Sequence, residues 1–433
     1  MKKLSDIKNE YSKAIKVGWF LALRQIKHSG KGTTGLIIFI MVLTFLNLVV
    51  VYGLLVGLIA GSFKQFSESY AGDVIITSSP GWNYIENSSA IITFLENNPD
   101  VENISPRYGI NVQLLGTLND LPKKNERTNK IGIRLTGIDP EKEEAVTHFS
   151  RFIKKGTMLE QDTEGYILIG SNMIKKYSSF ADANIPGLDL LKDVDVGSRV
   201  RVSFSLKDGN MVAKDFIVRG IVKSKVDEIS TRAFILDKEL RRMLPVNQGE
   251  VQEIAVITAP GMAEKVASDA KSFMGEYSAR IQTATEAIPS FLRNIETTMT
   301  VLGNALSSFA LVVASITIFI VIFINAVTKR KSIGIMKGIG ISPLSVQFSY
   351  VFQAFFYGIT GSAIGLFLTF GILKPYFDAN PINFPFSDGI LIATPEIAAV
   401  RVFILLIVTL IAGYVPAKII IRKNTLDSIL GRN

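Results

Sequence analysis

The sequence contains no cysteine and only two histidines, His28 and His148, among its 433 residues. Disulfide bonds, thiolate metal sites and cysteine nucleophiles are therefore excluded. A histidine-rich metal site is excluded too, and His148 is the single histidine available as a catalytic base in the central part of the chain. We accordingly expect no catalytic, cofactor-binding or metal site, and we expect that the chain itself is not an enzyme.

Charged residues are missing from three long apolar runs, Leu36 to Ala60, Leu306 to Val327 and Val351 to Leu373. A helix needs about 20 residues to cross the hydrocarbon core of a membrane, so each run is long enough to span it. A fourth run, Ile397 to Val415, contains Arg401 near one end, where a long side chain can reach the interface. The sequence predicts four spans, at residues 36–62, 306–328, 346–373 and 396–415.

The net charge of +9 comes from three segments beside these runs. Residues 1–35, 328–350 and 416–433 together carry sixteen Lys and Arg against three acids, Asp6, Glu10 and Asp427. Such basic flanks mark the cytoplasmic side of membrane proteins. We therefore expect a multi-pass protein of the cell (inner or plasma) membrane with both termini in the cytoplasm, and we expect contact with membrane lipid and no nucleic-acid partner.

The segment between the first two spans would then lie outside the cytoplasm. It alternates short β-like runs with helical stretches, which favours an α+β domain. Lys207-Asp-Gly-Asn210 is a strong turn signal and predicts a hairpin between two of the strands. The predicted strands are 73–78, 110–116, 131–137, 166–169, 199–205, 216–222 and 253–258, and the predicted helices are 171–177, 237–243 and 262–273.

Apolar residues continue at helical spacing from Ile288 to Leu306, directly into the second span. This pattern predicts a stalk helix over 288–305 that joins the soluble domain to the membrane. A helix packed beneath the domain would give the same periodicity, and the sequence leaves that alternative open.

Two glycine patterns call for different interpretations. The segment Gly30-Lys-Gly-Thr-Thr-Gly35 matches a dinucleotide-binding pattern literally, but no strand precedes it and a membrane span follows, so we read it as an interfacial elbow after an amphipathic helix around Lys16 to Lys27. Small residues at every fourth position allow close helix packing. We predict such packing, within or between subunits, at Gly53, Gly57, Gly61, Gly361 and Gly365.

The stretch Lys329-Arg-Lys-Ser-Ile-Gly-Ile-Met-Lys-Gly-Ile-Gly340, followed by a glycine-rich span, resembles the FtsX-like permease domain. This family includes MacB, FtsX and the lipoprotein-releasing LolC/LolE permeases. The tail segments Val415-Pro-Ala-Lys418 and Asn424 to Leu430 are similar to the end of that domain. The stretches at 71–76, 135–140 and 216–221 are similar to the MacB-like periplasmic core, particularly its lipoprotein-releasing variants.

The resemblance implies that the segment from Lys329 to Gly340 couples to a nucleotide-binding subunit. Apolar side chains would enter a groove of that partner, and basic ones would meet acidic or lipid phosphate groups. The family usually has Glu where this chain has Ser332, which puts a charge pair at that contact in doubt. The expected coupling residues are Lys329, Arg330, Lys331, Ser332, Ile333, Gly334, Ile335, Met336, Lys337 and Gly340.

The resemblance further implies the permease subunit of an ABC-type, type VII mechanotransmission transporter. It would pair as a homodimer, or as a heterodimer with a related permease, around two copies of a separate ATPase. Its load would be lipoproteins or lipids, exported peptides or drugs, or a cell-wall hydrolase that it activates. The residues alone also leave open a membrane-anchored sensor or binding protein, or an anchored ectoenzyme.

The expected fold is thus four transmembrane helices with a large extracytoplasmic α+β domain, a MacB-like periplasmic core, inserted between spans 1 and 2. Beyond the four spans given above, we predict the following segments: an amphipathic elbow at 1–35, the extracytoplasmic domain at 63–287, the stalk at 288–305, a cytoplasmic coupling loop at 329–345, a short extracytoplasmic loop at 374–395 and a cytoplasmic tail at 416–433.

Overall fold

The computed structural model describes residues 2–28, 30–116, 129–179, 181, 189–206, 208–244, 249–275, 279–384, 388–389 and 391–421. The chain forms two compact units. The membrane unit comprises Met1–Ile59, Asn294–Ile382 and Gly389–Asn433, and the inserted domain comprises Ala60–Arg293 with Asn383–Asp388. The predicted tail segment Asn424 to Leu430 lies outside the described residues.

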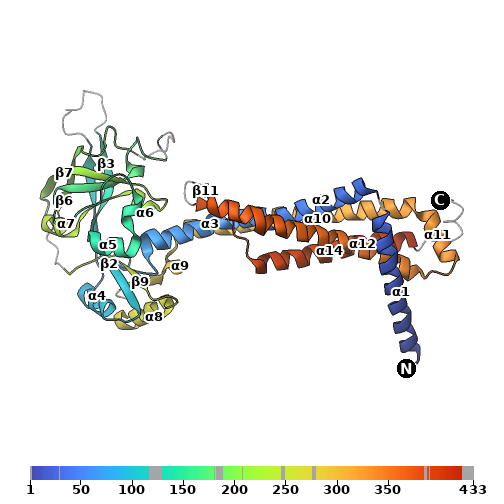
Figure 1. Ribbon diagram of the computed structural model, residues 1–433. Coiled ribbons are helices and arrows are strands. Elements are labelled where there is room, and N and C mark those ends of the chain that lie inside the picture. Colours follow the sequence, from blue (N-terminus) through green and yellow to red (C-terminus); the bar gives the residue numbers. More distant parts are fainter. Residues whose placement is uncertain are drawn as a thin grey trace. The chain divides into compact units, whose positions relative to one another are not determined.

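Among the described residues, four helices are long and apolar enough to cross a membrane, and most of their length lies in the membrane unit. Helix α12 packs against α2, α14 and the N-terminal helix α1. Figure 1 shows α2, α12 and α14 running beside α10, whereas α1 projects away from them. The first long helix comprises α2 (Lys31–Leu46), η1 (Asn47–Val51), α3 (Tyr52–Phe66) and η2 (Ser67–Ala71). The others are α10 (Ser290–Thr328), α12 (Pro343–Leu368) with η5 (Thr369–Leu373) and α13 (Lys374–Ala379), and α14 (Pro395–Ile421).

Two helix boundaries differ from the sequence prediction. Helix α1 covers Lys2–Lys27, and α2 already begins at Lys31, so Gly32 and Gly35 lie inside a helix and not in an elbow. At the other end of the unit, the third long helix continues to Ala379, past the loop predicted to begin at residue 374.

Pro375 does not end this helix, because a π-helical segment, η5, directly precedes it. Proline lacks an N–H and its ring clashes with the carbonyl four residues earlier, which normally kinks or stops an α-helix. A π-turn widens the backbone locally and moves that carbonyl. The helix therefore passes through a residue that sequence rules treat as a boundary.

The predicted packing glycines lie at close contacts within the unit. A Cβ atom on Gly361 would lie 2.4 Å from Cβ of Met41, and one on Gly53 would lie 2.4 Å from the carbonyl oxygen of Ile392. Gly365 faces the ring of Phe45 in the same way. The sequence left open whether these glycines pack within one subunit or between subunits. Gly361 and Gly365 pack within the chain, because both contact α2. Gly57 and Gly61 are buried.

The inserted domain is built on a mixed sheet in the order β10-β1-β9-β2-β3-β8-β5-β7-β4, with β6 paired to β2 and β7. The pairs β3–β8 and β5–β7 are parallel, and the other pairs are antiparallel. The strands are β1 (Val74–Thr77), β2 (Val101–Leu115), β3 (Lys130–Ile138), β4 (Ile153–Gly156), β5 (Tyr166–Gly170), β6 (Arg199–Ser205), β7 (Met211–Val222), β8 (Arg232–Leu236), β9 (Glu253–Thr258) and β10 (Arg280–Thr283).

Helices cover parts of this sheet, as the left half of Figure 1 shows. They are α4 (Ser88–Glu96), α5 (Pro140–Thr147), α6 (Asp227–Ser230), α7 (Asp237–Met243), α8 (Ala263–Met274) and α9 (Ala284–Ala287). Strands β11 (Ile382–Asn383) and β12 (Asp388–Gly389) form a separate small pair. The expected α+β class of the domain is confirmed.

Local predictions in this domain succeeded where the pattern was strong. The seven predicted strands are present, and the hairpin of β6 and β7 is confirmed with Ser203 opposite Ala213. Strands β4, β8 and β10 were missed, because each is only four or five residues long and lacks a clean alternation. The predicted helix 171–177 is wrong: only the short 3₁₀ turn η4 (Ser171–Met173) forms, and Ile174 then bridges to Leu191.

Candidate functional site

The predicted coupling segment folds as a short helix between two long ones. Helix α11 (Arg330–Gly338) follows α10 after Lys329, and it ends where Gly340 adopts a φ of +93°. That left-handed conformation favours glycine and closes the turn, in which Ile341 N–H donates to the carbonyl of Met336 at 3.0 Å. Helix α12 starts three residues later at Pro343.

One side of α11 belongs to the core of the membrane unit. Ile333 is only 3% exposed, Gly334 is buried, and Met336 packs partly buried against the same apolar cluster. These three residues were expected to contact a partner. The structure instead places Ile333 and Gly334 inside the unit, because the helical turn points them toward the long helices.

The opposite side of α11 is open. Ile335 is 49% exposed and Ile339 is 74% exposed, and Lys331 and Ser332 are exposed beside them. Ile339 was not among the residues predicted for coupling, although its position at i+4 from Ile335 places both on one helix face. We call Lys331, Ser332, Ile335 and Ile339 the α11 surface.

Lys337 has a structural contact. Its Nζ donates to the carbonyl oxygen of Ile421 at 2.5 Å, which ties α11 to the C-terminal end of α14. Burial lowers the pKa of this ammonium group from its ordinary value. The contact holds α11, which follows α10, against the end of α14. It also directs the Lys337 side chain away from the α11 surface.

Helix α1 is held against α12 by small residues that the sequence analysis did not single out. Ala14 and Ala22 are buried, and a Cβ on Gly18 would lie 2.7 Å from Cβ of Phe348. Gln353 Nε2 donates to Gln25 Oε1 at 2.7 Å farther along the same interface. The four-residue spacing of Ala14, Gly18 and Ala22 was the signal that could have predicted it.

Arg401 joins three helices of the membrane unit. Its guanidinium lies 4.3 Å from the ring centre of Tyr52, and Nη2 donates to Asn304 Oδ1 at 3.4 Å. An arginine in an apolar helix is costly unless partners satisfy it. The aromatic face and the amide supply these partners within the chain.

A buried network of charges lies in the inserted domain at the end of the first long helix. Tyr70 of η2 donates to Glu253 Oε2 at 2.8 Å, and the guanidinium groups of Arg107 and Arg232 each lie 5.1 Å from the centre of its ring. Arg107 Nη1 donates to the Tyr70 carbonyl at 2.9 Å. Arg107 also forms a two-pronged ion pair with Glu143, at 2.8 and 2.7 Å.

The electrostatics of this network follow from its burial. Burial by itself raises the pKa of Glu253, but the attraction of Arg232 and Arg107 is stronger and lowers the pKa to about 2. Burial also raises the pKa of the Tyr70 hydroxyl, which remains a donor. Every charge in the network therefore has an opposite partner, which joins η2 firmly to the sheet.

The titratable groups considered in the sequence analysis can be placed in the described part of the chain. His148 is exposed and interacts with the carbonyl of Glu144 at the end of α5, at 3.1 Å from Nδ1. In the described part of the chain no three His, Asp or Glu side chains gather in a way that could hold a metal ion. The α11 surface is thus the feature that most resembles a functional site in the membrane unit.

Comparison with known families now identifies this region. Residues 304–425, which include α11, α12 and the larger part of α10, match the model of the FtsX-like permease C-terminal domain. The C-terminal part of the chain is therefore an FtsX-like permease domain. Together with the four long apolar helices, this makes the permease a multi-pass membrane protein.

One relative among curated proteins is an uncharacterized ABC transporter permease of Methanocaldococcus jannaschii. It is 24% identical over 248 residues, which are 55% of this permease and 59% of the relative. This permease thus matches less than two thirds of that protein's length.

Two solved structures show a weaker likeness. The periplasmic region of MacB from Actinobacillus actinomycetemcomitans is 14% identical with a TM-score of 0.34, over 52% of this permease and 94% of that chain. The extracellular domain of the noncanonical ABC-type transporter YknZ from Gram-positive bacteria is 12% identical with a TM-score of 0.31, over 48% and 99%.

Proposed function

We propose that this permease is the membrane subunit of an ABC-type complex and that a separate ATPase docks on the α11 surface. The observation that carries the proposal is the exposed pair Ile335 and Ile339 beside Lys331, inside the segment that matches the permease family. An apolar pair ringed by polar and basic groups suits a groove with acidic edges. In this assignment Ile333 supports the surface from beneath and makes no contact with the ATPase.

The proposal continues into the inserted domain, which we place outside the cytoplasm. Helix α10 is continuous from Ser290 to Thr328, so motion at its α11 end can reach the inserted domain without a flexible linker. The Tyr70 network also ties the end of the first long helix to the sheet of the inserted domain. ATP hydrolysis would thereby move the inserted domain, in a dimer of this permease or with a related one, and no load need cross the bilayer.

Among possible loads, we propose lipoproteins or other lipids of the outer leaflet as the first to test. The mechanism requires no channel, and a membrane subunit that moves an external domain suits a load already exposed at the membrane surface. Activation of a cell-wall hydrolase would use the same motion with a different partner.

The docking proposal is tested by purifying the permease from native membranes in mild detergent and identifying co-purifying proteins by mass spectrometry, with an ATPase assay. We expect a Walker-motif ATPase to accompany the permease, and Ile335→Asp and Ile339→Asp to release it. Met211→Asp, at a residue of the inserted domain that is 77% exposed, is the matched control and should retain it.

Two outcomes would contradict the proposal. Recovery of the permease alone from several mild detergents, without ATP hydrolysis, would favour an anchored sensor or binding protein. Retention of the ATPase by both Asp variants would show that it docks on a surface other than the α11 surface. Ile333→Asp tests folding and not docking. A charge in the core should lower the yield of folded permease whether or not an ATPase docks.

A further inference from the structure

Strand β2 of the inserted domain has an open stretch along one edge. On one side it pairs with β3 from Tyr108 to Leu115. On the other side it pairs with β9 up to Arg107, and with β6 only from Gln113 onward. No strand in the described part of the chain pairs with that second edge from Tyr108 to Val112. At about 3.4 Å per residue, the opening is about 17 Å long.

The backbone groups that face the opening can be assigned. Gln252 N–H donates to the carbonyl of Arg107 at 2.9 Å, and Gly109 N–H donates to the side-chain Oε1 of Gln252 at 3.3 Å. Since residues of a strand alternate in the side to which N–H and C=O point, Gly109 and Asn111 face the opening and Ile110 faces β3. The carbonyl of Gly109 and both backbone groups of Asn111 are thus presented there.

The Gln252 side chain occupies the place of a neighbouring strand at Gly109. Its oxygen accepts from Gly109, and it also accepts from Arg134 Nη2 at 2.5 Å. Its Nε2 donates to the carbonyl of Asn83 at 2.7 Å. A side-chain amide therefore substitutes for a peptide group at the first position of the opening and leaves the next position, Asn111, to another partner.

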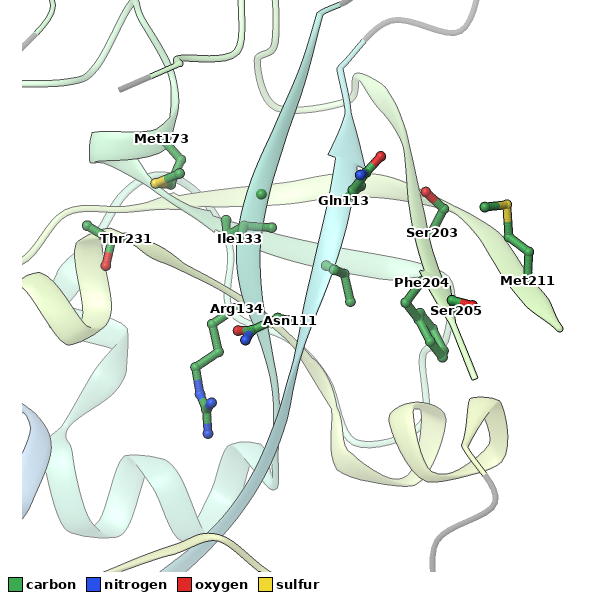
Figure 2. Close-up of a pocket in the computed structure, with 12 residues that line it drawn as sticks. Asn111, Gln113, Ile133, Arg134, Met173, Ser203, Phe204, Ser205, Met211 and Thr231 are labelled. Carbon is green, nitrogen blue, oxygen red and sulfur yellow. The ribbon is translucent and has the colours of Figure 1, made fainter. Parts of the chain in front are cut away.

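Space is available beside this edge. A cavity of about 550 Å³ is lined by Tyr108 to Asn111 on one side and by Phe204, Ser205 and Leu206 of the diverging β6 chain on the other. A second cavity, of about 680 Å³, shares Asn111, Arg134, Phe204 and Ser205 with it. Figure 2 shows the separation, with Asn111 on β2 and with β6 turning away from it between Ser203 and Ser205.

We propose that this opening binds an extended peptide segment of a second polypeptide, which adds a short strand to β2 between β9 and β6. An exposed edge with unpaired backbone groups is a template for strand addition, and the backbone hydrogen bonds then supply the affinity. The occupant is a peptide and not a lipid chain, because the edge offers one donor and two acceptors in strand geometry. The inference is independent of ATPase docking, since all these residues lie in the inserted domain.

The lining also indicates the side chains that such a peptide carries. Successive residues of a strand point to opposite faces. On one face of β2 the opening is bordered by the apolar Tyr108 and Ile110, and on the other by Asn111 with the neighbouring Arg134. We therefore infer a segment in which apolar and polar residues alternate.

The test uses the full-length permease in detergent and two labelled peptides. One is a five-residue peptide of alternating valine and threonine, whose length matches the opening, and the other is the same peptide N-methylated at every residue, which removes the backbone donors of both edges. We expect saturable binding of the first, at least tenfold weaker binding of the second, and slower hydrogen exchange at the Asn111 amide when the first is bound. The fold-change corresponds to about 1.4 kcal/mol or more.

Variants locate the site. Ser205→Trp should fill the opening and abolish binding, whereas Ser268→Trp, an exposed position on α8, should not change it. Asn111→Ala keeps the backbone groups and should bind as the natural chain does. Three results would each overturn the proposal: equal binding of both peptides, unchanged hydrogen exchange at the Asn111 amide, or no saturable binding by the folded permease without substitutions. ATPase co-purification is measured separately, so failure here leaves that result unaffected.

Discussion

The Arg107–Glu143 pair shows how the inserted domain carries charge in its interior. Both side chains are 3% exposed, and Ser105 and Thr147 donate further hydrogen bonds to the Glu143 carboxylate at 2.7 and 2.9 Å. Removing water from two charges is expensive, and the geometry of the pair must offset it. Loss of one partner is therefore more harmful than loss of an exposed pair.

We predict that Glu143→Ala lowers the free energy of unfolding of the inserted domain by about 3 to 5 kcal/mol, because it leaves the Arg107 guanidinium buried without its carboxylate. Urea titration of the full-length permease measures this change, with hydrogen exchange of peptides from β2 as the readout at each urea concentration. The control is Asp215→Ala at the exposed pair with Arg201, where we expect no measurable shift. Equal shifts for the two variants would contradict the assignment.

Glu253 makes the same domain sensitive to acid. Its pKa falls from an ordinary 4.5 to about 2 on folding, so the stability it contributes is complete above pH 4.5 and is lost as the pH falls toward 2. We predict that Glu253→Gln lowers stability at neutral pH and flattens its decline between pH 4.5 and 2. Urea midpoints at several pH values test this, and an undiminished pH dependence in the variant would assign the effect to other carboxylates.

At the scale of elements, close approach of α2 and α12 depends on glycine. The Cβ position on Gly361 is occupied by Met41, whereas a Cβ on Gly35 of α2 has no heavy atom within 4 Å. Both glycines lie in helices, but only Gly35 has room for a Cβ atom. They form a matched pair for testing whether packing or helix propensity decides stability.

We predict that Gly361→Ala destabilises the permease by about 1 to 3 kcal/mol, because the added methyl group forces the two helices apart. Gly35→Ala should be neutral or slightly stabilising, because alanine favours a helix over glycine. Thermal unfolding of both variants in the same detergent makes the comparison. A similar loss in both variants would argue that the α2 to α12 contact is loose.

At the scale of the whole molecule, the topology prediction concerns the sides of the membrane on which the inserted domain and the α11 surface lie. Because the chain lacks cysteine, single cysteines can be introduced without any background. Ser332 on the α11 surface and Met211 of the inserted domain are both exposed and suit this purpose.

We predict that a membrane-impermeant maleimide labels Met211→Cys in intact spheroplasts and labels Ser332→Cys only after the membrane is opened. The reason is the Lys and Arg excess around Ser332, which favours retention in the cytoplasm. The reverse pattern would invert the topology. Labelling of both cysteines in intact spheroplasts would contradict the four-span arrangement, because that arrangement places one span, α10, between the two sites and so puts them on opposite sides of the membrane.

Much of this protein was predictable from sequence, because the determining physics is local or additive. The burial of an uncharged run of 25 residues in lipid depends on length and composition, and strand alternation in Arg199–Ser205 depends on neighbouring residues. The four apolar helices, the α+β class and the FtsX-like permease domain could therefore be inferred from patterns. The short strands β4, β8 and β10 could not, since their pairing energy comes from partners distant in the sequence.

The tertiary structure decided which face of each element meets which neighbour. Ile333 and Ile335 are alike in sequence, yet one is buried and the other exposed, because only the packing of α11 onto the long helices distinguishes them. In the same way, the open edge at Asn111 exists because β9 and β6 stop short of each other along β2. Composition and periodicity determine that elements form, whereas long-range contacts determine what they leave exposed for a partner.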